Sequence, residues 1–95
     1  MGKHAIVIGA VGHIVADRLV SRRADLGITQ TDLALIVTEA GRRMGRQAIA
    51  EIETRQRRVD VDDVAVLAAV LDTTTAYLMG ELDDPNQKYT PARRR

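Results

Sequence analysis

Arg46, Gln47 and Glu51 lie within six residues of one another, and each has a side chain suited to hydrogen bonding with a base edge. Arginine can form a bidentate pair with guanine, glutamine can form one with adenine, and glutamate can accept from cytosine N4. On a helix that advances about 100° per residue, these side chains share one face with Ala50. We therefore predict a base-reading surface made of Arg46, Gln47, Ala50 and Glu51. The alternative is an ordinary solvated helix face.

The segment that carries these residues also has an apolar side. Gly45 precedes the segment, and Ala48, Ile49 and Ile52 fall opposite the polar face. Because the apolar side of a helix packs against a core, the polar side stays free to contact another molecule. The pattern predicts a short helix that opens at Gly45.

Two helices are predicted before this segment. Apolar residues recur every three or four positions from Val11 onward, and Gly27 supplies a stop. Thr29 has the chemistry to N-cap a second helix, with Asp32 in its first turn, and this helix should end near Gly41. The side chains expected inside are Val11, Ile14, Val15, Leu19 and Leu26 from the first helix, and Leu33, Ile36 and Val37 from the second.

Two more helices are predicted after it. Asp60 and Asp63 resemble a capping pair that opens a fourth helix, and Thr74 can cap a fifth that Gly80 ends. The buried stripe of the fourth helix should be Val61, Val64, Leu67 and Leu71. Residues 1–10 are expected to form a short arm and residues 83–95 a flexible, polar tail. The whole is an all-α domain of five helices over residues 11–82.

Length and composition narrow the class of protein. Ninety-five residues make one small domain, and the absence of cysteine excludes disulfides, Cys-ligated zinc and a thiol nucleophile. The longest apolar stretches fall far short of the roughly 20 residues that cross a bilayer, and no secretory signal opens the chain. We expect a cytoplasmic, nucleoid-associated protein.

No catalytic or cofactor motif emerges. His4 and His13 lack partners for a metal site, and neither a Ser-His-Asp order nor a carboxylate pair in a plausible cleft is present. Residues 6–12 imitate the first turn of a dinucleotide-binding fold, but no acidic residue after a second strand could hold a ribose. We therefore expect a protein that is not an enzyme and that uses no cofactor and no metal.

Charge is divided along the chain. Residues 18–58 hold nine arginines against five acidic residues, a net charge of +4, whereas residues 59–84 hold seven acidic residues and no basic one. Such an asymmetry favours one face that meets a polyanion and another that avoids it. The alternative is two ordinary solvated faces.

Four short motifs carry a family resemblance: GITQTDLA at residues 27–34, IAEIE at 49–53, LAAVL at 67–71 and YLMG at 77–80. With the five predicted helices, they resemble the lambda/434 repressor-like (Cro/CI, XRE) helix-turn-helix family. The Gly- and Arg-rich segments before the first and third helices are similar to those of a subgroup from high-GC bacteria and their phages.

The resemblance implies roles for individual residues. The family pairs an Arg near the end of the first helix with the Glu that closes the third, which implies a structural ion pair between Arg23 and Glu53. Its glutamine in the first turn of the second helix contacts a phosphate, and Gln30 stands at that position. The other phosphate contacts that we expect are Arg42, Arg43, Arg55, Arg57 and Arg58.

Two departures from the family pattern concern the turns. The connection at residues 38–44 is longer than the usual three or four residues, so either the second helix runs on or a loop presents Arg42 and Arg43 to DNA. Arg55 stands where many relatives have Gly.

Taken together, these features predict a sequence-specific DNA-binding transcriptional regulator of bacterial or phage origin. We expect a repressor that binds double-stranded operator DNA as a homodimer, because one helix reads too few base pairs and two half-sites about 34–36 Å apart are needed. Met79, Leu82 and the arm are spare apolar groups for the dimer contact, although the arm could equally pack on its own domain. The alternatives are an antitoxin or a protein-interaction module of a multicomponent regulator, and a toxin or an antirepressor is then the protein partner.

Overall fold

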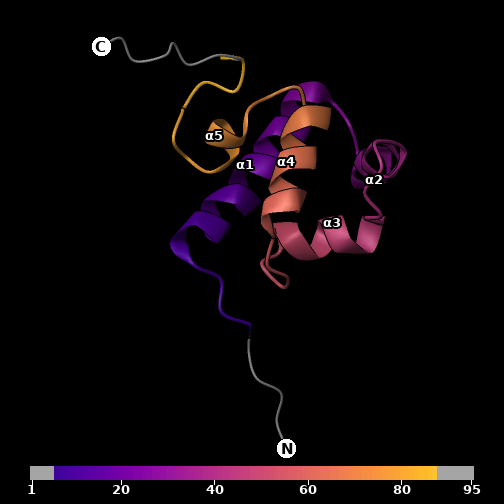
Figure 1. Ribbon diagram of the computed structural model, residues 1–95, viewed down its shortest axis with the longest axis horizontal. Coiled ribbons are helices and arrows are strands. Elements are labelled where there is room, and N and C mark those ends of the chain that lie inside the picture. The colour runs from indigo at the N-terminus through magenta and orange to yellow at the C-terminus, as the bar shows by residue number, and fades with distance from the viewer. Residues whose placement is uncertain (1–5, 88–95) are drawn as a thin grey trace, which may run out of the picture.

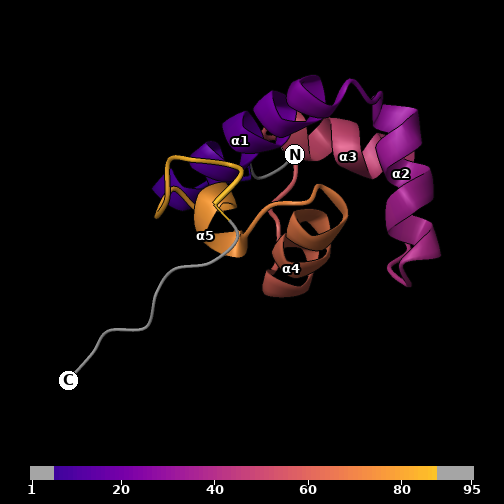
Figure 2. The ribbon, with the colours of Figure 1, turned by 90° about the horizontal axis from the view of Figure 1, so that it is seen from above.

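The computed structural model describes residues 6–87, which form five helices and no strand. The helices are α1 (Ala10–Leu26), α2 (Gln30–Glu39), α3 (Arg46–Glu53), α4 (Val61–Val70) and α5 (Thr75–Leu78). The predicted all-α, five-helix architecture is thus confirmed (Figure 1). Figure 2 shows α2 at one end of the molecule, α5 beside the first part of α1 at the other end, and α3 and α4 between them.

Side-chain caps begin three of these helices. The Thr29 side chain accepts from the Asp32 amide while the Asp32 carboxylate accepts from the Thr29 amide, which is a reciprocal capping box at the start of α2. Asp60 and Asp63 form the same arrangement at the start of α4, and Thr74 caps α5. At the C-terminal end of α1, Gly27 has a φ of 68°, a left-handed conformation that glycine adopts without strain.

The core is aliphatic, with Tyr77 its one aromatic member among the described residues. Side chains from all five helices meet there, including Leu19, Leu33, Ile49, Leu67 and Leu78. Met44, between α2 and α3, is only 1% exposed and fills the core from the turn. Because that side chain is buried, residues 40–45 form an anchored turn after α2 ends at Glu39.

Several residues predicted to be buried are exposed instead. Val61, Val11, Leu26 and Ile36 were assigned to the inner stripes, yet Val61 is 81% exposed and Val11 is 51% exposed. Val61 and Val11 lie in the first turns of α4 and α1, and Leu26 ends α1, where the chain extends past the core. Helical periodicity identifies a face but does not show how far along the helix the core reaches.

Two arginines of α1 hold the chain that follows α4. The buried Arg22 donates to the carbonyl oxygens of Leu71 (2.8 Å) and Asp72 (2.9 Å). Arg18 donates to the carbonyls of Tyr77 (2.9 Å) and Leu82 (2.7 Å), and its guanidinium lies 4.4 Å from the centre of the Tyr77 ring. The carbonyls of Leu71 and Tyr77 lie at the C-terminal ends of α4 and α5, where a helix leaves its last carbonyl groups without an internal partner.

The first residues of the expected tail belong to the folded body. The Thr73 hydroxyl donates to the Pro85 carbonyl, and Arg22 donates to the side-chain oxygen of Asn86. Residues 83–87 therefore lie against α1 and the α4–α5 turn. The rest of the predicted tail, residues 88–95, and residues 1–5 of the predicted arm lie outside the described residues.

Candidate nucleic-acid interface

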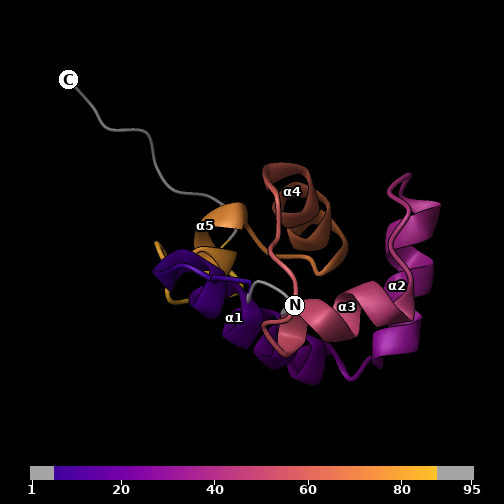
Figure 3. The same cartoon turned by 90° about the horizontal axis from the view of Figure 1, so that it is seen from below.

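The polar face of α3 carries all four candidate base-reading residues. Arg46 and Gln47 are exposed, Ala50 and Glu51 are half-buried, and Ile49 and Ile52 pack into the core on the other side. Figure 3 shows α3 running across the molecule between α1 and α2. Arg46 makes no hydrogen bond or ion pair with any residue in the described range 6–87. Its guanidinium is therefore free to bind another molecule.

Gln47 and Glu51 are joined to each other. The Gln47 Nε2 donates to the Glu51 Oε2 at 3.0 Å, one helical turn away. This leaves the second amide hydrogen and the Oε1 of Gln47 available at the surface.

A hydrogen-bonded cluster fixes the far end of α3 to α1 and α2. Arg23 donates from Nε to Glu53 Oε2 at 2.8 Å and from Nη2 to Oε1 at 2.9 Å, in a bidentate pair. Gln30 donates its amide to the same Oε1 at 2.8 Å. The hydrogen bond to Glu53, opposed by burial, raises the pKa of Arg23. The Glu53 carboxylate thus connects α1, α2 and α3. Gln30, which was expected to bind phosphate, is one of its donors.

Arg42 fixes the turn that precedes α3. Its Nε donates to Asp63 Oδ1 at 2.8 Å and its Nη2 to Asp60 Oδ2 at 3.0 Å. The hydrogen bond with Asp63, opposed by desolvation, raises the pKa of Arg42. Asp63 is only 1% exposed, so Arg42 neutralises a buried carboxylate at the start of α4. Its neighbour Arg43 is exposed and has no such partner within the part of the chain that the structure describes.

The three arginines after α3 contact different parts of the domain. Arg55, at a φ of 64°, turns to α1, where its Nε donates to His13 Nδ1 at 2.9 Å and its Nη2 forms an ion pair with Asp17. The Nη2 of Arg57 lies 3.6 Å from Asp63 Oδ2. Arg58 is exposed and donates to the carbonyl of Val7 at 3.0 Å, with no acidic partner among residues 6–87. Arg43 and Arg58 are therefore the least engaged of the phosphate candidates.

Four of the predicted phosphate contacts have a second role that the sequence did not reveal. Arg42, Arg55 and Arg57 each have a carboxylate partner within the domain, and the neutral amide of Gln30 donates to Glu53. The capping pair at Asp60 was a usable signal, because a helix N-terminus with three carboxylates attracts a cation from a neighbouring turn.

None of the helices in residues 6–87 has the length and apolarity to span a bilayer. No group of three or more metal-ligating side chains gathers in that range.

The chain belongs to a family of known proteins. Residues 19–78 match the family model described as helix-turn-helix, of the XRE/Cro/CI-like type, and this stretch includes α2 through α5. The protein is therefore a member of that helix-turn-helix family, as the sequence motifs predicted. The family consists of DNA-binding transcription regulators, which are typically not enzymes. Searches of curated proteins and of solved structures found no significant match.

Proposed function

We propose that this DNA-binding regulator reads operator DNA by inserting α3 into the major groove. The observation that carries the proposal is the exposure of Arg46 and Gln47 at the N-terminal end of α3 while Ile49 and Ile52 anchor its other side. The major groove admits one helix, and side chains near the N-terminus of that helix reach base edges. Arg46 then recognises guanine and Gln47 recognises adenine, with Ala50 and Glu51 completing the surface.

The support around α3 favours this role. The Arg23–Glu53–Gln30 cluster holds its C-terminal end, and Arg42 with the buried Met44 holds the turn before its first residue. A reading helix must be held in a defined orientation, because base contacts tolerate only small displacements. Both clusters lie outside the face that carries Arg46, so they do not compete with bases for it.

Phosphate binding in this proposal falls first to Arg43, which has no acidic partner in residues 6–87. Arg58 has no acidic partner in that range either, but it donates to the Val7 carbonyl and contributes a smaller share. Gln30 can use its second amide hydrogen and the amide groups at the start of α2. A smaller share of the DNA affinity is assigned to the arginines that remain paired with carboxylates in the domain, namely Arg42, Arg55 and Arg57. They still add to the local positive potential.

We propose that the protein acts in the cytoplasm as a homodimeric repressor associated with the nucleoid. A dimer presents two copies of α3 to half-sites about one helical turn apart, and this doubles the number of bases read. A protein bound across an operator blocks polymerase by occupying the DNA.

Selection of bound DNA from a randomised pool tests the proposal. The wild type should enrich one sequence with two related half-sites about 10 base pairs apart. The Arg46→Ala/Gln47→Ala double variant should bind all sequences weakly and with strong salt dependence, while the control Glu39→Ala, changed at an exposed site on α2, should select the wild-type sequence. Equal loss of affinity for selected and random DNA in the double variant would contradict the assigned roles.

A further inference from the structure

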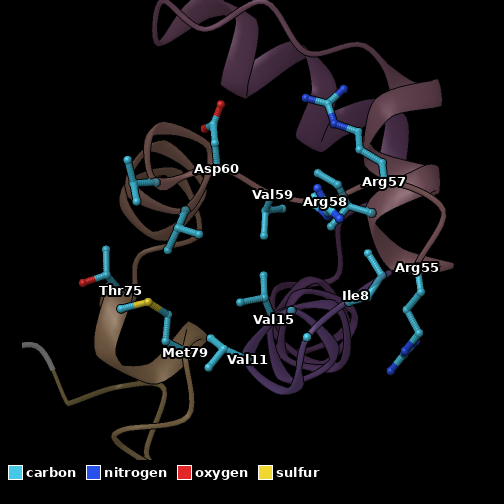
Figure 4. A pocket seen from close by; sticks show the side chains of 15 residues that line it. Ile8, Val11, Val15, Arg55, Arg57, Arg58, Val59, Asp60, Thr75 and Met79 are labelled. Atoms are coloured by element: carbon cyan, nitrogen blue, oxygen red, sulfur yellow. The ribbon is translucent and has the colours of Figure 1, made fainter. Parts of the chain in front are cut away.

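An apolar groove of about 430 Å³ opens at the C-terminal side of α3 (Figure 4). Its floor consists of the core side chains Val15, Ile52 and Val64. Figure 4 shows Val11, Val15, Val59 and Met79 around the same opening. These residues come from α1, α3, α4, α5 and the 54–60 loop, so the groove is a junction that the domain's own helices leave unfilled.

The rim of the groove exposes more apolar surface than a solvated helix end requires. Val61 lines the groove at the first position of α4 and is 81% exposed, and Val11 on the opposite side is 51% exposed. The adjoining arm adds Val7 at 69% and Ile6 at 53%. Exposed apolar side chains around a groove make this part of the surface a candidate for interaction.

Charges of opposite sign flank Val61. Arg58, three residues before it, is exposed and donates a hydrogen bond to the backbone carbonyl of Val7. Asp62, directly after it, is an exposed carboxylate with no ion pair within residues 6–87. This surface carries a protruding apolar side chain, an apolar groove and charges of both signs. Two identical copies of such a surface can pair about a two-fold axis.

We propose that a second copy of this chain occupies the groove. Val61 of each protomer enters the groove of its partner, and Arg58 of each faces Asp62 of the other. This inference rests on the homodimer of the proposed function and specifies its interface. Because Ile52 on the groove floor belongs to α3, the contact adjoins the C-terminal end of α3 and leaves one reading helix on each side of the axis. A small apolar ligand in the groove would leave Val61 and both charges in water, so a second copy accounts for more of the surface.

Sedimentation of the DNA-free protein over a wide concentration range tests the apolar contact. Val61→Asp should raise the dimer dissociation constant by at least about 100-fold. Because the interface is two-fold symmetric, each substitution occurs twice and the dimer would bury two unpaired carboxylates. The matched control is Leu35→Asp on α2, which is 60% exposed and does not line the groove. Leu35→Asp should dimerise as the wild type does. A monomeric wild type, or a Val61→Asp dimer as tight as the wild type, would overturn the proposal.

A charge exchange tests the orientation. Arg58→Asp and Asp62→Arg should each weaken the dimer by about tenfold, and the double variant should restore it, since both contacts are then remade with reversed sign. A double variant no tighter than either single variant would overturn the pairing. Circular dichroism on each variant verifies that the domain is folded.

These outcomes are separable from those of the DNA experiment. Dimerisation is measured without DNA, and neither Val61 nor Asp62 lies on the reading face of α3. If Val61→Asp is monomeric but still prefers the wild-type half-site, the interface is correct and the reading face acts independently. If the wild type dimerises through this groove but selects no DNA sequence, the proposed function fails while the interface stands.

Discussion

Gln47 donates its side-chain amide to Glu51 across one turn of α3, with Nε2 3.0 Å from Oε2. A carboxylate only accepts hydrogen bonds, so it selects the orientation in which the amide nitrogen turns toward it. The remaining N–H and Oε1 of Gln47 then match the N7 acceptor and N6 donor of adenine. Glu51 thereby orients the residue that we propose to read the base.

Loss of Glu51 should broaden base preference at one position. Glu51→Ala frees the Gln47 amide to rotate, and the variant should lose part of the roughly 1–3 kcal/mol by which a bidentate pair discriminates between bases. Competition binding with operators changed at each position measures this effect. A uniform loss at every position would mean that Glu51 only supports the helix, and an unchanged profile would mean that the pair is irrelevant to reading.

Removal of Glu53 should destabilise the domain by about 3 kcal/mol, because Arg23 and Gln30 lose a shared, buried acceptor. Urea unfolding of Glu53→Ala measures the change. Glu39→Ala, at an exposed site, should stay within about 0.5 kcal/mol of the wild type. An unchanged midpoint for Glu53→Ala would show that the cluster contributes nothing to stability.

Arg22 should stabilise the folded domain through its hydrogen bonds as well as through its charge. Arg22→Ala leaves the carbonyls of Leu71 and Asp72 without their donor, with an expected loss of at least about 2 kcal/mol. Arg22→Lys keeps the charge without the fork of donors and should recover only part of the loss. Thermal unfolding distinguishes the three proteins, and full recovery by lysine would show that charge alone is needed.

Two capping carboxylates should make stability depend on acid pH. Hydrogen bonds from the backbone and side chain of Thr29 lower the pKa of Asp32 from its ordinary 3.8, and a backbone hydrogen bond from Asp63 is the largest cause that lowers the pKa of Asp60. A lowered pKa in the folded state stabilises the protein above about pH 3.8, and this contribution is lost as pH falls through the folded value.

The variants Asp32→Asn and Asp60→Asn keep a side-chain oxygen that can accept the capping hydrogen bond, but they have no group that titrates. Their unfolding free energy should change less with pH between neutral and acid solution than that of the wild type. Urea unfolding at several pH values measures the slopes. Slopes equal to the wild type would place the acid sensitivity in other carboxylates.

Salt dependence should separate a free arginine from the engaged ones. Arg43→Ala should reduce the slope of log K against log salt by about 0.9, since it removes one phosphate contact. Arg55→Ala should reduce the slope less, because that side chain is paired with Asp17. Arg58→Ala should also reduce it less, because Arg58 donates to the Val7 carbonyl and faces Asp62 of the second copy in the proposed dimer. Base preference within a half-site should be unchanged in all three, and a slope equal to the wild type for Arg43→Ala would remove that residue from the interface.

The local features of this protein could be predicted from its amino-acid sequence. Helix starts at Thr29 and Asp60, the stop at Gly27 and the two-sided pattern of α3 depend on interactions within a few residues, and the structure contains all of them. The motifs that carried the family resemblance are equally local, and the family match confirms it.

Which charged side chains are free could not be predicted in this way, because it depends on contacts between distant segments. Arg42 meets Asp63, 21 residues away, because α4 packs against α2, and Arg55 meets His13, 42 residues away, because α1 packs against α3. The exposure of Val61 was settled in the same way, since a periodic pattern cannot show where the core ends along a helix. Contacts between distant segments depend on how whole helices pack, and that information is spread over the entire core.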